Sequence, residues 1–432
     1  MSTALIAMGI VILVCALLRF SIVLMMFSSG IVYLWLKGQD IGLIVDQTLN
    51  SMFSMYVLLA VPMFIFAGNV MNASTVSERI WSAADVVVGR LRGGMGHITV
   101  LMNVVMSSMS GSAISDAAGP GMVSIRMMEK VGQYPRGLAV AIAAAAACLG
   151  PIIPPSIPMV IYALVSGASV GALFLGGLLP GLCMTLLMMA VVHFIATRRN
   201  MPREEPVPRA MWPQIIARGA LPLSMPIVLL GGIYSGAFTP TEAAAVAALH
   251  ALVLSAWVFK ALSWKSFWAV VLESARASAV ITIILAGSFM LNYAFTAEGV
   301  PQGMAQWVDG LQLSRLQFLL MVNVLFLVLG CFLDVSVLLL VFVPMLLPAA
   351  KLLGVDLVHF GVLVVLNMMI GLIHPPFGML LFVTKALTGI PIGEMVREGW
   401  LFLVMLLGLL LCITLFPEIV LWLPHAMGYT TA

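Results

Sequence analysis

Gly150-Pro151-Ile152-Ile153-Pro154-Pro155 and Gly371-Leu372-Ile373-His374-Pro375-Pro376 are the two stretches of sequence that decide the fold. Each places paired prolines inside apolar sequence, where a helix cannot continue because proline lacks the N–H group and its ring clashes with the preceding turn. Lipid does not replace the lost hydrogen bonds, so such a break has to line a cavity inside the protein. Matched breaks in two halves of a membrane chain are typical of the central site of a secondary transporter.

The composition is that of a polytopic membrane protein. Of the 432 residues, 62% are hydrophobic and 9% are charged, which exceeds what a soluble core needs. The first residues lack a basic region and a small-residue cleavage site, so we expect them to form the first span rather than a signal peptide.

The five cysteines lie scattered in apolar sequence without the spacing of a zinc site or a disulfide framework; they are Cys15, Cys148, Cys183, Cys331 and Cys412.

Apolar windows of about 20 residues predict two halves of five spans each. The expected spans are 4–18, 20–36, 51–71, 137–165 and 170–197, then 219–235, 239–259, 277–296, 357–384 and 399–423. The spans 137–165 and 357–384 are broken helices. Two further segments, 97–131 and 315–352, are split by the tips Ser110-Gly111-Ser112 and Gly330-Cys331, and each is predicted to be a re-entrant helical hairpin.

The predicted organisation is therefore a first repeat over residues 1–197, a charged and proline-rich cytoplasmic connector over 198–218, and a second repeat over 219–432. Five crossings per half make the second repeat inverted relative to the first. With both termini outside, all but three of the 20 Lys and Arg residues face the cytoplasm, the exceptions being Lys37, Arg315 and Lys351. This asymmetry is what the positive-inside rule requires. Two amphipathic stretches, 74–92 and 264–276, are expected either at the membrane surface or as ordinary connecting helices.

Polar residues are concentrated at the hairpin tips. Ser110, Ser112 and Ser115 offer neutral oxygens, which suit a hard cation such as sodium, although small residues also permit close helix packing. Asp116 and Asp334 are acids within apolar sequence and need an ion or a donor beside them; a capping role is the alternative for both. His374, where the first break has Ile153, is either a substrate contact or a structural histidine.

The segment GAFTPTEAAAV predicts a helix start rather than a ligand site. Thr239 is the expected N-cap, Pro240 the first helical residue, and Glu242 completes a capping box. The chain has neither a G-x-x-x-x-G-K-[ST] loop nor an H-E-x-x-H motif, so ATP hydrolysis and zinc proteolysis are not supported. We expect no cofactor, and energy has to come from an ion gradient.

At these residues the chain resembles the large membrane subunit of tripartite ATP-independent periplasmic (TRAP) transporters, the DctM-like family. The resemblance extends from about residue 61 to 424 and includes MSGSAISDAAGPGM, LGPIIPPSIPMVIYALVSGASVGALFLGGLLPG, GGIYSGAFTPTEAAAV, GCFLDVSVLLLVFVPMLLP and GLIHPPFGM. It implies an all-α, inverted-repeat, elevator-type transporter of the bacterial inner membrane that is coupled to sodium ions. It also implies two partners, a small membrane subunit expected as a separate chain and a periplasmic solute-binding protein.

The resemblance also implies the site residues. The expected sodium sites combine each tip with the break that follows it, and comprise Ser110, Gly111, Ser112, Gly150 and Pro154 in one half and Gly330, Asp334, Gly371 and Pro375 in the other. The residues expected beside a carboxylate substrate are Ser112, Ser115, Pro155, His374 and Pro376. His374 departs from the small polar residue that the family pattern implies there.

Three hypotheses remain at this point. The first is sodium-driven import of an organic acid together with the two partners. The second is a self-sufficient ion-coupled carboxylate transporter of the same architecture. The third is a membrane enzyme that uses Asp116 and Asp334 as a pair of carboxylates sharing a proton. The sequence does not identify the acid, and no nucleic acid is expected as a partner.

Overall fold

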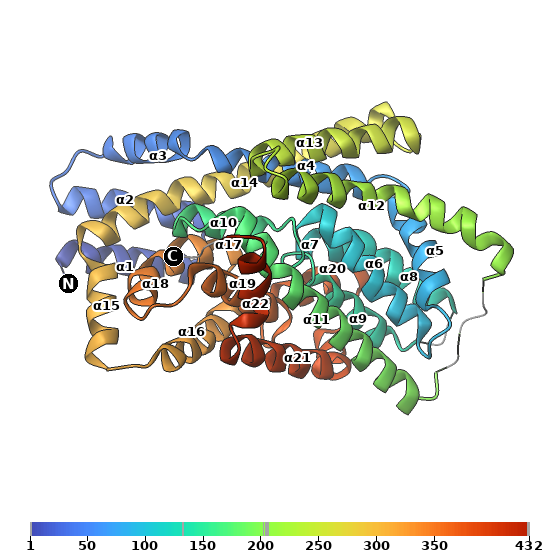
Figure 1. Ribbon diagram of the computed structural model, residues 1–432. Helices are drawn as coiled ribbons and strands as arrows, with labels where there is room; N and C mark the ends of the chain where they lie inside the picture. Colours follow the sequence, from blue (N-terminus) through green and yellow to red (C-terminus); the bar gives the residue numbers. More distant parts are fainter. Residues whose placement is uncertain (1, 132–133, 202, 204–206, 430–432) are drawn as a thin grey trace.

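The computed structural model describes residues 2–131, 134–201, 203 and 207–429. Every element within these ranges is helical, so the predicted all-α fold class is confirmed. Part of the predicted connector, namely Pro202 and residues 204–206, lies outside the described residues. Figure 1 shows most helices running along one long axis, with α15 lying across it at the end nearer the N-terminus and α5 and α8 at the other end.

The first half of the chain contains the following elements: α1 (Thr3–Leu17), α2 (Ile22–Leu36), α3 (Leu43–Ser54), η1 (Tyr56–Leu59), α4 (Ala60–Asn72), α5 (Val76–Val88), α6 (Gly94–Ser110), α7 (Ala113–Asp116), η2 (Ala117–Gly121), α8 (Met122–Val131), α9 (Arg136–Ala147), α10 (Ile157–Ser166) and α11 (Val170–Arg198). The segment predicted as the first hairpin is α6 to α8, and the first broken helix is α9 with α10.

The second half contains the corresponding series: η3 (Arg209–Met211), α12 (Trp212–Tyr234), α13 (Pro240–Val253), η4 (Leu254–Val258), α14 (Trp264–Ala297), α15 (Val300–Gly310), α16 (Arg315–Gly330), α17 (Val335–Val337), η5 (Leu338–Phe342), α18 (Val343–Leu352), α19 (Leu357–Ile373), α20 (Met379–Thr388), α21 (Ile392–Leu415) and α22 (Glu418–Ala426). The second hairpin is α16 to α18, and the second broken helix is α19 with α20.

Within the described ranges, six helices are long and apolar enough to cross a membrane, or up to seven if α3 and η1–α4, bent by 77°, count as one span. Apolar side chains that are exposed in the isolated chain, such as Leu186 and Ile227, lie on these helices. The length and composition of these helices agree with a multi-pass membrane protein.

The helical segment that precedes each break is buried. Residues Gly137–Ala147 of α9 and Val358–Ile373 of α19 are buried throughout, so the two equivalent helices form the centre of the core. In the first break, Ser156 caps α10 by accepting a hydrogen bond from Met159 N and also donates one to Pro151 O at 2.5 Å. The Pro154-Pro155 and Pro375-Pro376 bonds are both cis.

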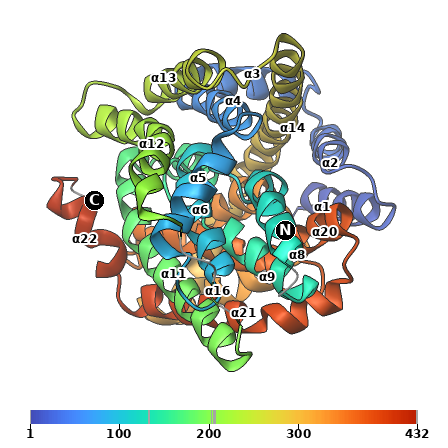
Figure 2. The same ribbon diagram turned by 90° about the vertical axis from the view of Figure 1, so that its right-hand side faces the viewer.

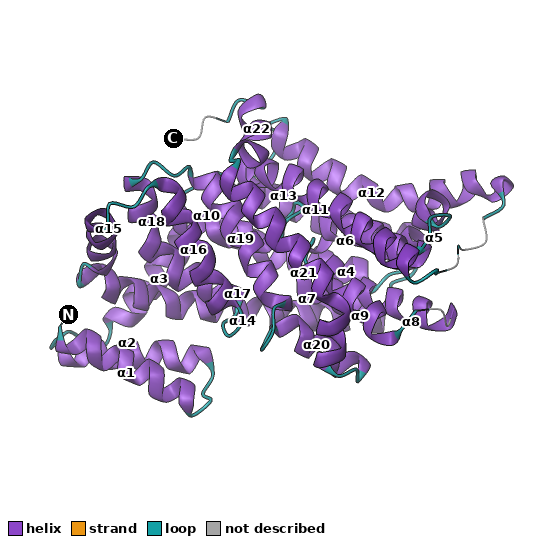
Figure 3. Cartoon of the chain, turned by 90° about the horizontal axis from the view of Figure 1, so that it is seen from below, coloured by secondary structure: helices purple, strands orange, loops and turns teal. Residues whose placement is uncertain are grey.

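The two hairpins turn near the middle of the molecule. Figures 1 and 3 both place α7 and α17, which follow the two tips, near the centre of the long axis. The second arm of each helical hairpin begins with a short α-helical turn. It continues as a π-helical turn, η2 or η5, before the α-helix resumes. π-helical turns inside α-helices are rare and occur often at functional sites.

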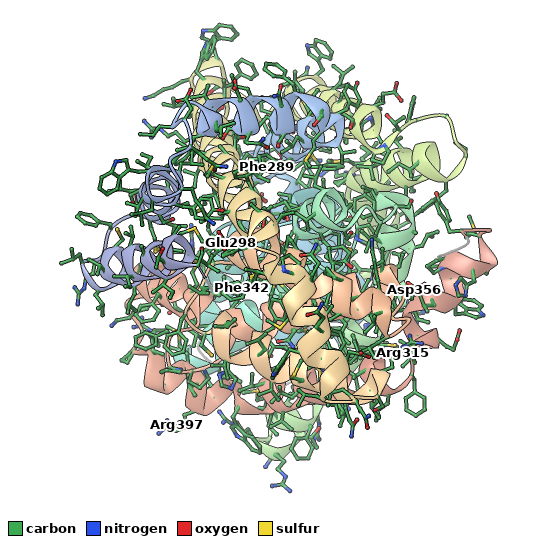
Figure 4. All side chains as sticks on the ribbon, turned by 90° about the vertical axis from the view of Figure 1, so that its left-hand side faces the viewer. Phe289, Glu298, Arg315, Phe342, Asp356 and Arg397 are labelled. Carbon is green, nitrogen blue, oxygen red and sulfur yellow. The ribbon has the colours of Figure 1, made fainter. Side chains whose placement is uncertain are left out.

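The short helix α4 and the long helix α14 pass beside the hairpins. α4 packs against α13 and α14, and α14 also packs against α2 and α3. Asn69 Nδ2 of α4 donates to Ser274 Oγ of α14 at 3.0 Å. We call α4 and α14 the frame helices, because each of them also contacts a hairpin. Figure 2 shows α1 and α2 as a pair at one edge of the molecule, and Figure 4 views the end where α14 reaches Glu298 and α16 begins at Arg315.

The helices differ from the predicted spans at several places. The predicted surface stretch 264–276 and the predicted span 277–296 form the single helix α14. The helix α12 begins at Trp212, inside the stretch predicted as connector, and α21 ends at Leu415 before Pro417, so 399–423 is not one helix. The helices α3 and α15 were not predicted, because neither is long or apolar enough to appear in a hydropathy window. The capping box at Thr239 and Glu242 is confirmed.

Candidate functional site

A cavity of about 590 Å³ lies between the two hairpin tips and the frame helices. The first hairpin contributes 110–115 and Ala118, and the second contributes Asp334, Val335 and Ser336. The frame contributes residues from both helices, namely Ile65, Gly68, Asn69, Glu273, Ala277, Val280, Ile281 and Ile284. Pro151 and Leu372 bring both breaks to the same cavity, and its size falls in the range of small-molecule sites.

The first tip is bound to the first break through its backbone. Gly111 turns the chain with a φ of 61°, a conformation that favours glycine. Its carbonyl oxygen accepts a hydrogen bond from Ile157 N at 3.3 Å, and a Cβ at Gly111 would lie 2.6 Å from Pro155 O. The tip and the start of α10 therefore fit together only with glycine at this position.

Asp116 lies fully buried behind this tip. Its carboxylate accepts hydrogen bonds from the hydroxyl groups of Ser107, at 3.3 Å, and of Ser110. A Cβ at Gly150 would lie 2.5 Å from Asp116 Oδ2, so the break approaches the carboxylate closely. Asp116 does not line the cavity. It orients Ser110, which does, and it holds the tip beside the first break.

The second tip meets the second break in a comparable way. A Cβ at Gly371 would lie 2.8 Å from the carbonyl carbon of Gly330, so the two glycines allow direct backbone contact. Asp334 caps α17 by accepting a hydrogen bond from Ser336 N at 2.8 Å. Cys331 Sγ lies 3.2 Å from His374 Nδ1. His374 thus contacts the hairpin tip and does not line the cavity.

The ionisable side chains among the described lining residues of the cavity are acidic. Glu273 and Asp334 line it, whereas no Lys, Arg or His occurs among the described residues that do so. The remaining polar groups are the hydroxyls of Ser110, Ser112, Ser115 and Ser336 and the amide of Asn69. Such a surface can ligate a hard cation through oxygen atoms, and an anion placed there needs a cation to balance its charge.

The structure divides the predicted site residues into two groups. The residues that line the cavity are Ser110, Gly111, Ser112, Ser115 and Asp334. The others support the tips or lie elsewhere in the breaks, and comprise Gly150, Pro154, Pro155, Gly330, Gly371, His374, Pro375 and Pro376. Pro375 lines a separate cavity of about 30 Å³ together with α9 and α21, and Pro376 is exposed. The ligand roles assigned to these residues stay predictions.

Sequence reasoning missed the contribution of the frame. Gly68, Asn69 and Glu273 line the cavity, but none belongs to a tip or a break. A signal existed for Glu273, since it is the only acidic residue between Glu242 and Glu298. The sequence pattern places Glu273 in an amphipathic surface stretch, because the continuity of α14 cannot be seen in a hydropathy window.

A multi-pass helical protein with two hairpins and two broken helices around one central cavity has the features of a membrane transporter. The family model described as "Tripartite ATP-independent periplasmic transporter, DctM component" matches residues 5–419. The chain belongs to this family, and the resemblance seen in the sequence is confirmed.

Relatives with assigned names support the same conclusion. The chain is 38% identical to the C4-dicarboxylate TRAP transporter large permease protein DctM of Pseudomonas aeruginosa, covering 86% of this chain and 87% of the relative. It is also 38% identical to the sialic acid TRAP transporter large permease protein SiaM of Vibrio cholerae, covering 87% and 88%. It covers 65% of the sialic acid TRAP transporter permease protein SiaT of Haemophilus influenzae, at 33% identity.

A solved structure shares the fold. The YdaH transporter of Alcanivorax borkumensis, whose crystal structure shows an unusual topology, superposes with a TM-score of 0.57 over 87% of each chain. The sequence identity is 16%, so this likeness concerns the architecture alone.

Proposed function

We propose that this chain is the large permease subunit of a sodium-driven TRAP transporter that imports an organic acid across the bacterial inner membrane. The observation that carries the proposal is the cavity between the two tips, which offers acidic and hydroxyl oxygens and no cationic side chain among its described lining residues. A carboxylate entering such a cavity needs a positive partner, and cations bound at the tips supply it.

An elevator movement is the second part of the proposal. Each tip is joined to the break of its own half, through Gly111 and Ile157 in one half and through Gly330 and Gly371 in the other. Hairpin and broken helix therefore form one packed unit per half. A packed unit shifts between discrete arrangements more readily than it deforms, which favours movement of both units as a body against the frame helices.

The orientation and partners complete the proposal. Both termini are periplasmic, a small membrane subunit assembles with this chain, and a periplasmic solute-binding protein delivers the cargo. Charge supports the orientation, since the predicted cytoplasmic segments carry most of the Lys and Arg residues. The named relatives handle C4-dicarboxylates and sialic acid, so the cargo of this chain is an organic acid, and the chain acts as a transporter rather than an enzyme.

The test is uptake into vesicles that contain the chain with its small subunit, with its binding protein outside. Radiolabelled succinate and sialic acid serve as first cargoes. Uptake should require an inward sodium gradient and both partners, and it should stop when potassium replaces sodium. Uptake by this chain alone favours the self-sufficient carboxylate transporter. Chemical conversion of a cargo by the purified chain, lost in an Asp116→Asn/Asp334→Asn double variant, favours the membrane enzyme.

A further inference from the structure

A frame asparagine contacts the first hairpin directly after its tip. Asn72, near the end of α4, donates a hydrogen bond through Nδ2 to Ser115 Oγ at 2.9 Å. Ser115 lines the cavity and directly precedes Asp116 and the π-helical turn η2. Gly119, inside η2, packs against the same amide, since a Cβ there would lie 3.1 Å from Asn72 Cγ. The end of α4 is thus fitted to the π-helical turn of the first hairpin.

A second frame asparagine makes the matching contact in the other half. Asn292 of α14 donates through Nδ2 to Leu340 O at 3.0 Å. Leu340 lies in the middle of the π-helical turn η5, directly after α17 and the lining residues Asp334 to Ser336. An amide bonded to a main-chain carbonyl fixes the backbone of the hairpin rather than a side chain.

The two contacts occupy equivalent places in the duplicated sequence. Asn72 precedes the tip glycine Gly111 by 39 residues, and Asn292 precedes Gly330 by 38. Both asparagines lie near the C-terminal end of a frame helix, and both donate to a residue within or beside the π-helical turn of the following hairpin. The same device therefore occurs once in each half.

We propose that Asn72 and Asn292 are an equivalent pair of positioning residues that hold the two hairpins against the frame helices in the arrangement of this structure, so that both tips present their oxygens to the cavity together. Both bonds are released when the hairpins move against the frame helices. The inference rests on the proposed sodium-coupled transport and adds to it the residues that preorganise the site. The Asn69–Ser274 bond joins the frame helices, so the two tips are held to one common support.

A close approach between the frame and the first tip strengthens the argument. A Cβ at Gly68, one helical turn before Asn72, would lie 2.9 Å from Ser110 Cα. The frame helix therefore contacts the main chain of the tip and not only its side chains. A tip that has lost its contacts with the frame helix would have to be ordered again each time an ion binds. The free energy of this ordering would weaken ion binding.

The test measures the sodium concentration that half-saturates thermal stabilisation of the purified full-length chain, with choline chloride keeping the ionic strength constant. Asn72→Ala and Asn292→Ala should each raise this midpoint roughly fivefold, since one net hydrogen bond has that effect on an equilibrium, and the double variant should raise it further. Asn292→Asp, similar in shape but without a donor, should behave like Asn292→Ala. Ser224→Ala, which removes a bond between α12 and α13 to His250, is the matched control and should leave the midpoint unchanged.

The outcomes separate this inference from the proposed function. If the unaltered chain shows no sodium-dependent stabilisation, sodium coupling fails. If the unaltered chain responds to sodium and the asparagine variants have a lower melting temperature with an unchanged sodium midpoint, the asparagines are structural and the inference is overturned. A normal midpoint in Asn292→Asp overturns the donor role of Asn292.

Discussion

Gly330 of the second hairpin and Gly371 of the second broken helix are in direct backbone contact: a Cβ at Gly371 would lie within 2.9 Å of the Cα, carbonyl carbon and carbonyl oxygen of Gly330. No flexible side chain is available there to move aside. The contact joins the second tip to the break on which it rests, and it has a direct consequence for substitution.

Gly371→Ala should separate the hairpin from the broken helix. Forcing a methyl group into a closely packed contact costs about 1–3 kcal/mol, and we expect a lower melting temperature in detergent together with reduced uptake. Gly408→Ala is the matched control, because Gly408 also lies within a helix and has nothing within 4 Å of its Cβ position. An unchanged melting temperature and uptake rate in Gly371→Ala would show that this contact is not required.

Asp116 should be required for the first tip to keep its shape. Asp116→Ala leaves the hydroxyls of Ser107 and Ser110 without their acceptor, which costs about 1–3 kcal/mol for buried groups. Asp116→Asn retains an amide oxygen as acceptor and should lose less. Thermal unfolding in detergent measures both.

The neighbouring glycine provides a sharper check on Asp116. Gly150→Ala should be strongly destabilising alone, since its Cβ would lie 2.5 Å from Asp116 Oδ2. In the Asp116→Ala background the nearest obstacle is gone, so the same substitution should cost less. Additive effects of the two substitutions would contradict the contact, because coupled neighbours are expected to deviate from additivity.

Asp334 allows its capping role to be separated from its charge. Asp334→Asn preserves the cap of α17, because asparagine is an equally good N-cap residue, whereas Asp334→Ala removes the cap as well. Since Asp334 is one of two acids among the described residues that line the cavity, we expect both variants to lose sodium dependence of uptake. Only Asp334→Ala should lose about 1 kcal/mol of stability in addition. Normal sodium dependence in Asp334→Asn would limit this residue to capping.

The ion pair at the end of α14 should make stability depend on pH. Lys37 Nζ lies 2.5 Å from Glu298 Oε1, and Tyr33 OH donates to the same oxygen at 3.2 Å. Bonding to Lys37 lowers the pKa of Glu298 below its usual value. A lowered carboxyl pKa stabilises the fold above the unfolded-state pKa, and this contribution is lost as the pH falls through the folded-state pKa.

Glu298→Gln should therefore lower the melting temperature at neutral pH and make it less sensitive to acidification. The measurement is a series of melting curves from neutral to acidic pH. Glu242→Gln is a useful comparison, because the pKa of Glu242 is also lowered, but by its hydrogen bonds to the cap residue Thr239. If the melting temperatures of Glu298→Gln and of the unaltered chain fall equally on acidification, the Lys37–Glu298 ion pair is not the cause of the pH dependence.

The parts of the fold that depend on local sequence could be predicted. Paired prolines break a helix wherever they occur, and the small residues at Gly111 and Gly330 mark the turns of the hairpins, so the segments 97–131 and 315–352 correspond to α6–α8 and α16–α18. Hydropathy windows predict the long apolar helices because hydropathy is also a property of local sequence.

The parts that depend on contacts between distant residues could not be predicted. Nothing in the sequence around Asn72 indicates that it meets Ser115, and the close approach of Gly68 to Ser110 exists only after α4 and the hairpin have packed. His374 illustrates the same limit. Its position inside a break suggested contact with cargo, but its nearest polar partner is Cys331.

The bond between Asn69 and Ser274 joins α4 to α14, and each of these helices holds one hairpin. Because these helices are joined, we expect a movement of one hairpin tip to shift the other tip through α4 and α14. We expect the two hairpin tips to move in synchrony. A spectroscopic label attached to either tip should then report a single common relaxation rate instead of two independent ones.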